Sequence, residues 1–198
     1  MSKFLIIGCP RSGTTYTTTF FRQIGFDVKH EKMGKHGCIG WNYAIDKEFK
    51  KKGTRVGIKF THILHQVRHP LLVMRSLPVT FAVRSEMKHI KRGVGKLCPD
   101  DLLIRCMQMW HKWNVLCEKQ SILTYRVEDL YRGSKLTKKL SNMLSFNLNK
   151  VKDIDTKTNS KKKKKSYIKT LTWKMLEDKN KKLFKKIVEQ TRRYGYEI

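Results

Sequence analysis

Short apolar runs alternate along this chain with longer segments whose apolar residues recur at helical spacing. The first apolar run covers residues 3–8 and ends in glycine, which predicts a buried strand. Residues 14–24 have helical spacing and are followed by Gly25, so they predict a helix that ends there. Further strands are predicted to start at Phe26 and to cover residues 55–60, 62–67 and 121–125.

The clearest helical pattern covers residues 100–119, where apolar side chains recur on one face with the period of a helix. Pro70 and Val127 are each predicted to begin a helix, and a final helix is predicted over residues 173–194. Strands that alternate with helices predict an α/β fold with a mainly parallel sheet. In such folds ligands bind at the carboxyl ends of the strands, so candidate site residues are sought there.

Length and cysteine content fit one domain with a core of its own. The 198 residues predict a single domain over residues 1–198 that folds without disulfides or a metal. The five cysteines form no CxxC pair and are expected to be reduced. No apolar run reaches the length of a membrane span, and the N-terminus lacks the pattern of a signal peptide. A soluble, cytoplasmic protein is therefore expected.

Charge is the feature of the composition that bears most on function. Lys and Arg number 44 while Asp and Glu number 16, which gives a formal net charge of +28. Such an excess predicts anionic partners: phosphates, nucleic acid, anionic lipid or acidic glycans. The charge peaks at Lys161–Lys165, and because five consecutive lysines repel one another, residues 153–168 are predicted to form a mobile loop. This loop is interpreted as a solvated segment, a nuclear localisation signal or a flap that closes over an anionic ligand.

The strongest motif is the segment Gly8-Cys9-Pro10-Arg11-Ser12-Gly13-Thr14-Thr15. It follows a predicted strand and opens a predicted helix. Its backbone N–H groups and the positive end of that helix would together form a cradle for an anion. Gly13 permits close approach of the backbone to the anion. The side chains that offer hydrogen-bond donors to it are those of Arg11, Ser12, Thr14 and Thr15.

The spacing of this segment is that of a Walker A loop, G-x-x-x-x-G-K-[ST], at Gly8, Gly13 and Thr15. Thr14 stands where such a loop has the lysine that reaches the β- and γ-phosphates. That substitution, and the lack of a convincing Asp for Mg²⁺ at the end of a later strand, argue against triphosphate chemistry. The segment is therefore predicted to hold a terminal anionic group without a metal. A P-loop nucleotide or small-molecule kinase is the alternative enzyme.

These residues resemble the sulfotransferase family, whose donor is 3′-phosphoadenosine 5′-phosphosulfate. The segment Pro10–Thr15 is similar to the family's 5′-phosphosulfate loop. Arg68, at the end of the predicted strand 62–67, and Ser76, on the following helix, resemble its 3′-phosphate motif. Weaker likenesses to further family elements lie at residues 125–130, 172–173 and 194–196.

The resemblance implies a three-layer fold of the P-loop-NTPase-like sulfotransferase type, with helices on both faces of a mainly parallel central sheet. It implies transfer of a sulfuryl group from 3′-phosphoadenosine 5′-phosphosulfate to a hydroxyl or amine of an acceptor, with no metal. The donor-binding residues that it implies are Arg11, Ser12, Gly13, Thr14, Thr15, Arg68 and Ser76. Arg11 is also implied in catalysis, because a cation there would offset charge on the transferring group.

Transfer to a hydroxyl also needs a base that takes the acceptor's proton. The pair His30-Glu31 follows the predicted second strand, where the family often places its base, and resembles a segment of some members. Glu31 is predicted to be the base, with His30 as the second candidate and His62 as the third. The spacing of His62, His65 and His69 does not gather them on one strand face, so no metal site is predicted.

Two non-catalytic functions compete with these enzymes. A nucleic-acid-binding protein would fit the charge, but it needs aromatic residues interleaved with basic ones, and Trp110 and Trp113 are predicted to be core residues. No specific nucleic acid is therefore predicted. The other is an inactive sulfotransferase-like fold that only binds. The acceptor stays open between an acidic glycan, another polyanion and a small hydroxylated molecule, and variable loops over residues 32–54 and 84–98 are predicted to shape its site.

Overall fold

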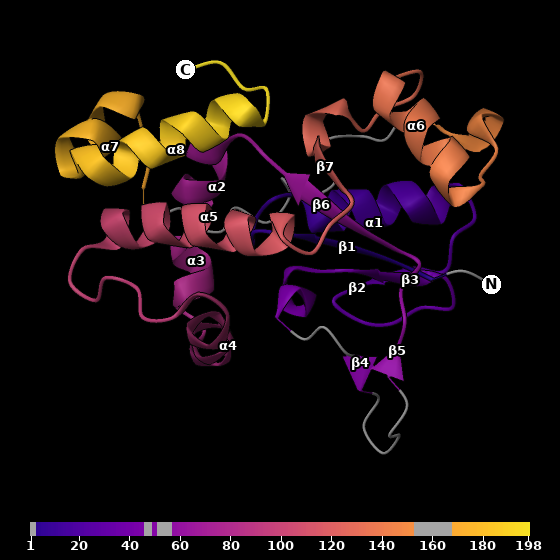
Figure 1. The fold of residues 1–198 in the computed structure, drawn as a ribbon, viewed down its shortest axis with the longest axis horizontal. Coiled ribbons are helices and arrows are strands. Elements are labelled where there is room, and N and C mark those ends of the chain that lie inside the picture. Colours follow the sequence, from indigo (N-terminus) through magenta and orange to yellow (C-terminus); the bar gives the residue numbers. More distant parts are fainter. Residues whose placement is uncertain (1–2, 46–48, 51–56, 153–167) are drawn as a thin grey trace.

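The computed structural model describes residues 3–45, 49–50, 57–152 and 168–198. A five-stranded, all-parallel sheet forms the centre of the fold, as Figure 1 shows. The predicted α/β fold with a mainly parallel sheet is thereby confirmed. The strands, in their order across the sheet, are β2 (Val28–His30), β3 (Gly37–Ile39), β1 (Phe4–Gly8), β6 (His62–Val67) and β7 (Leu123–Arg126).

Helices cover both faces of this sheet, because successive side chains of β1 point to opposite sides. Leu5 and Ile7 belong to one apolar core, and Phe4 and Ile6 belong to a second. The helices α1 (Thr14–Gln23) and α6 (Lys135–Leu144) contribute to the second core. The first core contains residues of α2 (Pro70–Ser76), α4 (Arg84–Val94), α5 (Leu102–Glu118), α7 (Trp173–Lys179) and α8 (Lys181–Arg193).

The helix predicted over residues 100–119 forms as α5, which starts two residues later and ends one residue earlier than predicted. Its N-cap is Asp101, whose Oδ1 accepts a hydrogen bond from the backbone N–H of Ile104 at 2.9 Å. Trp110 and Trp113 are completely buried, which confirms them as core residues. The shorter helices are α3 (Pro78–Phe81) and the 3₁₀ turns η1 (Trp41–Ala44), η2 (Val127–Asp129) and η3 (Leu148–Lys150).

Two predicted helix boundaries are wrong. The final segment is not one helix but two, because Asn180 is extended and its side chain accepts a hydrogen bond from the N–H of Leu183 to start α8. At Val127 only the 3₁₀ turn η2 begins. The next α-helix, α6, begins after its N-cap residue Ser134, whose hydroxyl accepts a hydrogen bond from the N–H of Thr137. In both cases a local side-chain cap overrides a continuous apolar pattern.

The strand predictions need correction between β1 and β6. The second strand starts at Val28 rather than Phe26, and β3 was not predicted. Of the predicted strand 55–60 the structure describes residues 57–60, of which Gly57–Ile58 form β5, and β5 pairs antiparallel with β4 (Phe49–Lys50) outside the central sheet. The loop predicted over residues 153–168, with Lys161–Lys165, lies outside the described residues except for its last position.

All five cysteines are free, and four of them are buried. Burial raises the pKa of the Cys38 and Cys106 thiols to about 12. It also raises the pKa of Cys9 and Cys117 well above the ordinary value. Among the described helices, none combines the length and the apolar character that crossing a membrane requires.

Candidate functional site

The candidate site lies at the carboxyl edge of the central sheet. Because the strands are parallel, β1, β2 and β6 all end at this edge, and Gly8 of β1 pairs in register with Gln66 of β6. The predicted anion-binding segment follows β1, His30 is the last residue of β2, and Arg68 follows β6. The fold thus brings together three segments that are far apart in the sequence.

The segment between β1 and α1, which we call the anion loop (residues 9–13), has the backbone of an anion cradle. Arg11 and Gly13 have positive φ angles of 73° and 93°, and the N–H of Ser12 donates to the carbonyl of Cys9 at 3.0 Å. No side chain caps the start of α1 at Gly13. The first N–H groups of a helix have no partner within it, so this end of α1 is free to donate to an anion.

The anion loop is held in place by the side chain of Gln66, which the sequence analysis did not name as a site residue. Its Nε2 donates to the carbonyl of Ser12 at 2.8 Å. Its Oε1 accepts from the hydroxyl groups of Thr17 and Tyr125, the latter at 3.2 Å. All four side chains are buried, so the network holds the loop in shape before any ligand binds. A polar residue within an otherwise apolar strand was the signal that could have found Gln66.

Ser12 is the loop residue whose hydroxyl has no protein partner. Its side chain is 1% exposed, and its Oγ forms no hydrogen bond with the described residues. A Cβ atom at Gly8 would lie 2.7 Å from this Oγ and 2.4 Å from the carbonyl oxygen of Gln66, so only glycine fits there. A buried hydroxyl without a partner costs free energy, and an anion in the cradle would supply the missing acceptor.

Of the two leading base candidates, His30 contacts the first residue of α1, directly after the anion loop, and Glu31 lies next to His30. The Oγ1 of Thr14 and the Nε2 of His30 are 2.9 Å apart, and the same Nε2 is 3.8 Å from an Oε1 of Glu31. Glu31 itself has a φ of 56°. Its backbone is held on both sides: its N–H donates to Ile39 at 2.9 Å, and its carbonyl accepts from the Tyr43 hydroxyl at 2.9 Å.

His62, the third base candidate, is in the wrong place. It is the first residue of β6 and pairs with Phe4, the first residue of β1. The anion loop follows the other end of β1, roughly 17 Å away along a strand of this length. The Nδ1 of His62 instead lies 3.2 Å from the hydroxyl of Thr61. The physical reason is the polarity of the strand, which places its first and last residues at opposite edges of the sheet.

Arg68 reaches the anion loop, whereas Ser76 is bonded within its own helix. The Nη1 of Arg68 donates to the carbonyl of Arg11 at 3.4 Å. The hydroxyl of Ser76 lies 2.9 Å from the carbonyl of Leu72 and 3.0 Å from that of Val73. An anion at Ser76 would therefore compete with hydrogen bonds that the hydroxyl already has, while Arg68 keeps further donors free.

Glu128 links the C-terminal segment to His69, the residue after Arg68. One Glu128 oxygen accepts from the backbone N–H of His69 at 3.1 Å, and the other accepts from the Tyr196 hydroxyl at 2.7 Å. The rings of His69 and Tyr196 are 5.4 Å apart. Burial lowers the pKa of His69 despite the nearby Glu128, which favours the neutral ring. Arg126 donates to Asp129 and to Gly195, which ties the end of β7 to the same segment.

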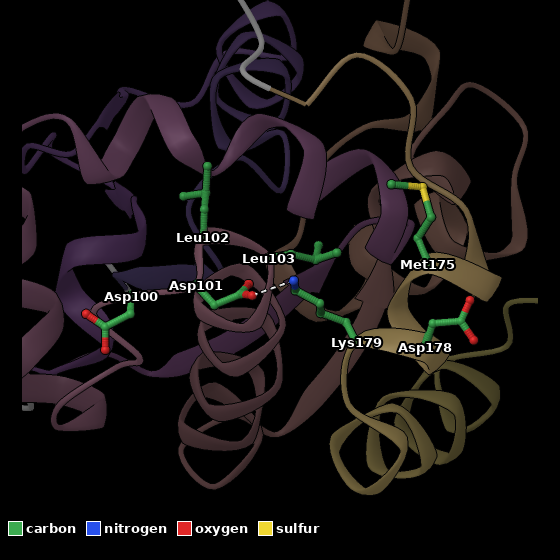
Figure 2. Close-up of a pocket in the computed structure, with 7 residues that line it drawn as sticks. All are labelled: Asp100, Asp101, Leu102, Leu103, Met175, Asp178 and Lys179. Atoms are coloured by element: carbon green, nitrogen blue, oxygen red, sulfur yellow. Dashed lines mark ion pairs between the residues drawn. The ribbon is translucent and has the colours of Figure 1, made fainter.

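A hollow of about 560 Å³ lies elsewhere, between the start of α5 and α7, as Figure 2 shows. The ion pair between Lys179 and Asp101, at 2.7 Å, spans it, and none of its lining residues is a candidate site residue. Lys174 pairs with Asp178 at 2.9 Å beside it, so most of its acidic groups already have basic partners. Within the described ranges no three His, Cys, Asp or Glu side chains gather as a metal site.

Comparison of the chain with models of protein families, with curated proteins and with solved structures gives no match. What the protein does is therefore inferred from the chemistry of the site. Its central features are an uncapped helix start, a buried unpartnered hydroxyl, two arginines and a histidine–glutamate pair.

Proposed function

We propose that the protein is a sulfotransferase that uses 3′-phosphoadenosine 5′-phosphosulfate and transfers its sulfuryl group to a hydroxyl or amine of an acceptor. The observation that carries this proposal is the 2.9 Å contact between Thr14 and His30. It joins the first residue of α1, directly after the anion loop, to His30, 16 residues further along the chain and next to Glu31. Binding of an anion next to a base is what this chemistry needs.

The residues present fit such a donor at its 5′ end. The uncapped amides of α1 and the unpartnered hydroxyl of Ser12 offer donors to its phosphosulfate oxygens. Arg11 is exposed at the same loop, and Arg68 would hold the 3′-phosphate. Ser76 would join Arg68 only after giving up its bonds within α2. When bound, the donor supplies a sulfuryl group on a phosphate leaving group.

Glu31 is the favoured base. Its side chain is 39% exposed and meets His30 only at 3.8 Å, whereas His30 Nε2 already faces the Thr14 hydroxyl. The Glu31 carboxylate would accept the proton of the acceptor hydroxyl, and His30 would orient the carboxylate. Arg11 would neutralise the negative charge that grows on the leaving phosphate, while Arg68 would hold the 3′-phosphate. His30 as the base is the alternative assignment at the same place.

Calorimetric titration with 3′-phosphoadenosine 5′-phosphate tests the proposal. The wild type should bind it without Mg²⁺. Arg68→Ala should weaken binding by roughly 10- to 100-fold, since a charge-assisted hydrogen bond is lost. Arg22→Ala removes an exposed arginine at the far end of α1 and should leave affinity unchanged, which makes it the matched control.

Glu31→Gln separates binding from chemistry. We expect it to keep the donor affinity and to lose turnover, measured with labelled donor over a panel of acceptors. Loss of affinity and turnover together would mean that Glu31 is not the base, and loss of turnover in His30→Gln alone would assign the role to His30. No binding of the nucleotide would overturn the proposal. Mg²⁺-dependent binding of ATP instead would overturn it in favour of a kinase.

A further inference from the structure

Residues 84–94 form helix α4 (Arg84–Val94), not the loop predicted over residues 84–98, and this helix presents a basic face to solvent. Arg84, Lys88, Lys91 and Arg92 are all exposed, and their spacing gathers them within an arc of about 100° over about 12 Å of helix. Figure 1 shows α4 at the periphery of the molecule. Ile90 on the other side of α4 is fully buried in the core that covers this face of the sheet.

Among the residues that the structure describes, this charge has no acidic partner, because none of the four side chains forms an ion pair there. Like charges one helical turn apart repel, so Arg84 with Lys88 and Lys88 with Arg92 destabilise α4 slightly. The only acidic residue of the helix, Glu86, lies about 200° around the helix from Arg84, away from this face.

Helix α4 is attached directly to the segment that supports Glu31. The Nε2 of His89 lies 2.7 Å from the carbonyl oxygen of Asn42, and the rings of His89 and Trp41 are 5.3 Å apart. The neighbouring Gly40 lies so close to Glu31 that a Cβ atom there would be 3.1 Å from the Glu31 Cα. Helix α4, which carries the basic face, is therefore joined through η1 to the residues next to Glu31.

The helix α8 is the natural comparison. Lys181, Lys182, Lys185 and Lys186 are equally exposed on one side of it, but Glu189 interrupts that side. The contacts of α8 lead to α5 and α7 rather than to η1 and Glu31. Equal charge is thus present on two helices, and of the two it is α4 that contacts η1, next to the proposed base.

We propose that the basic face of α4 binds the acceptor, and that this acceptor is an acidic glycan chain. The inference rests on the proposed function, because it places the acceptor hydroxyl at Glu31. A linear chain of sugars with repeated negative groups complements four positive charges along 12 Å of convex helix surface. Peptides are usually bound in a groove or at a sheet edge, and an exposed helix face is neither.

Two other polyanions fit α4 less well. Single-stranded nucleic acid needs exposed rings on which bases stack, and the one ring of α4, His89, lies against Trp41. A bilayer needs apolar side chains that insert, and Met87, Ile90 and Val94 of α4 pack against the protein core instead. Both polyanions nevertheless serve as competing outcomes of the experiment.

The test compares two variants with the same loss of charge. One is R84Q/K88Q/K91Q/R92Q in α4, and the matched control is K181Q/K182Q/K185Q/K186Q in α8. Affinity for a fluorescein-labelled heparin hexasaccharide is measured by anisotropy at low salt without donor. The α4 variant should bind about 30-fold more weakly than the wild type, and the α8 variant no more than about threefold. All eight side chains are exposed, so both variants should keep the wild-type melting temperature within a few degrees.

Further measurements separate the possible failures. Both variants should bind 3′-phosphoadenosine 5′-phosphate as the wild type does. If the wild type fails to bind that nucleotide, the proposed function fails, while the contrast between α4 and α8 still stands as measured. An equal loss of hexasaccharide affinity in both variants would overturn the proposal, because it would show only an effect of net charge. Tighter binding of single-stranded DNA or of anionic vesicles through the same four residues would overturn the choice of a glycan.

Discussion

Two candidate site residues have backbone conformations that residues other than glycine seldom adopt. Arg11 and Glu31 have φ angles of 73° and 56°, a conformation that costs about 1 kcal/mol per residue. Among the described residues, the one other such case is Ser145, which ends helix α6. A left-handed residue is ordinary at a helix end. The two remaining cases coincide with the anion loop and the proposed base, where strain is commonly kept because function needs it.

His65 leads to a prediction on pH. Its Nε2 donates to the Asn114 side-chain oxygen and its Nδ1 accepts from Thr124, both at 3.1 Å, which is the neutral form of the ring. Burial lowers the pKa of His65 to about 4, below its value of about 6.5 in the unfolded chain. The unfolded state therefore binds the proton more tightly, and stability falls as the pH drops below 6.5. Between pH 7 and pH 5 this histidine should cost about 2 kcal/mol.

Urea unfolding at the two pH values measures this loss. His65→Gln retains groups that can hydrogen-bond to both partners but does not titrate, so the variant should lose less stability than the wild type over the same interval. Identical losses in the two proteins would mean that His65 does not titrate as its burial indicates.

Among the elements, β3 depends on a single glycine. Gly37 has a φ of 142°, and a Cβ atom there would lie 1.9 Å from the backbone oxygen of Phe4, its partner in β1. Any side chain would force β3 away from β1. Because β3 is also the only neighbour of β2 among the described strands, the same displacement would reach the strand that ends at His30.

Gly37→Ala should therefore destabilise the protein by about 3 kcal/mol or more, or prevent folding. Gly25→Ala is the matched control: its φ is 98°, but nothing lies within 4 Å of the added Cβ. It should cost only about 1–2 kcal/mol from backbone strain. Urea denaturation of both variants gives the comparison, and equal stability would contradict the importance of the contact with Phe4.

The elements show which features a sequence can reveal. The strands β1 and β6 and the helix α5 were predicted because their apolar patterns are long and regular. The strand β3 was missed because Gly37-Cys38-Ile39 is too short for a pattern and starts with a residue of low strand propensity. Its formation depends on contacts with β1 and β2 that no local pattern contains.

The same distinction applies to the candidate site. The sequence predicted the anion loop, and it also predicted that His30, Glu31 and Arg68 would share its edge of the sheet. It could not predict the buried support from Gln66 or the link between Glu128 and Tyr196, because those contacts join residues more than 50 positions apart. It wrongly admitted His62, since resemblance to a short motif ignores the end of the strand on which the residue lies.

For the whole molecule, the net charge of +28 is the dominant long-range feature. Acidic residues number only 16, so most basic side chains have no acidic partner and repel one another. Added salt should stabilise the folded protein because it screens this repulsion. Between about 0.01 M and 0.1 M NaCl the screening length falls from about 30 Å to about 10 Å.

Melting temperature measured across this range of salt should rise. The K181Q/K182Q/K185Q/K186Q variant, with four fewer positive charges, should show a smaller rise. A melting temperature that falls with salt would mean that attractive ion pairs outweigh the repulsion.

The four buried thiols can report local opening of the protein through the rates at which they are labelled. An alkylating reagent attacks only the exposed thiolate, and burial suppresses both exposure and ionisation at Cys9, Cys38, Cys106 and Cys117. The rate at which each is labelled is therefore a clock for the local opening around it. Cys9 belongs to the anion loop, so its labelling measures how often that loop opens, and Cys117 measures the same for helix α5, which packs in the same core. An anion that binds the loop would slow the labelling of Cys9 more than the labelling of Cys117.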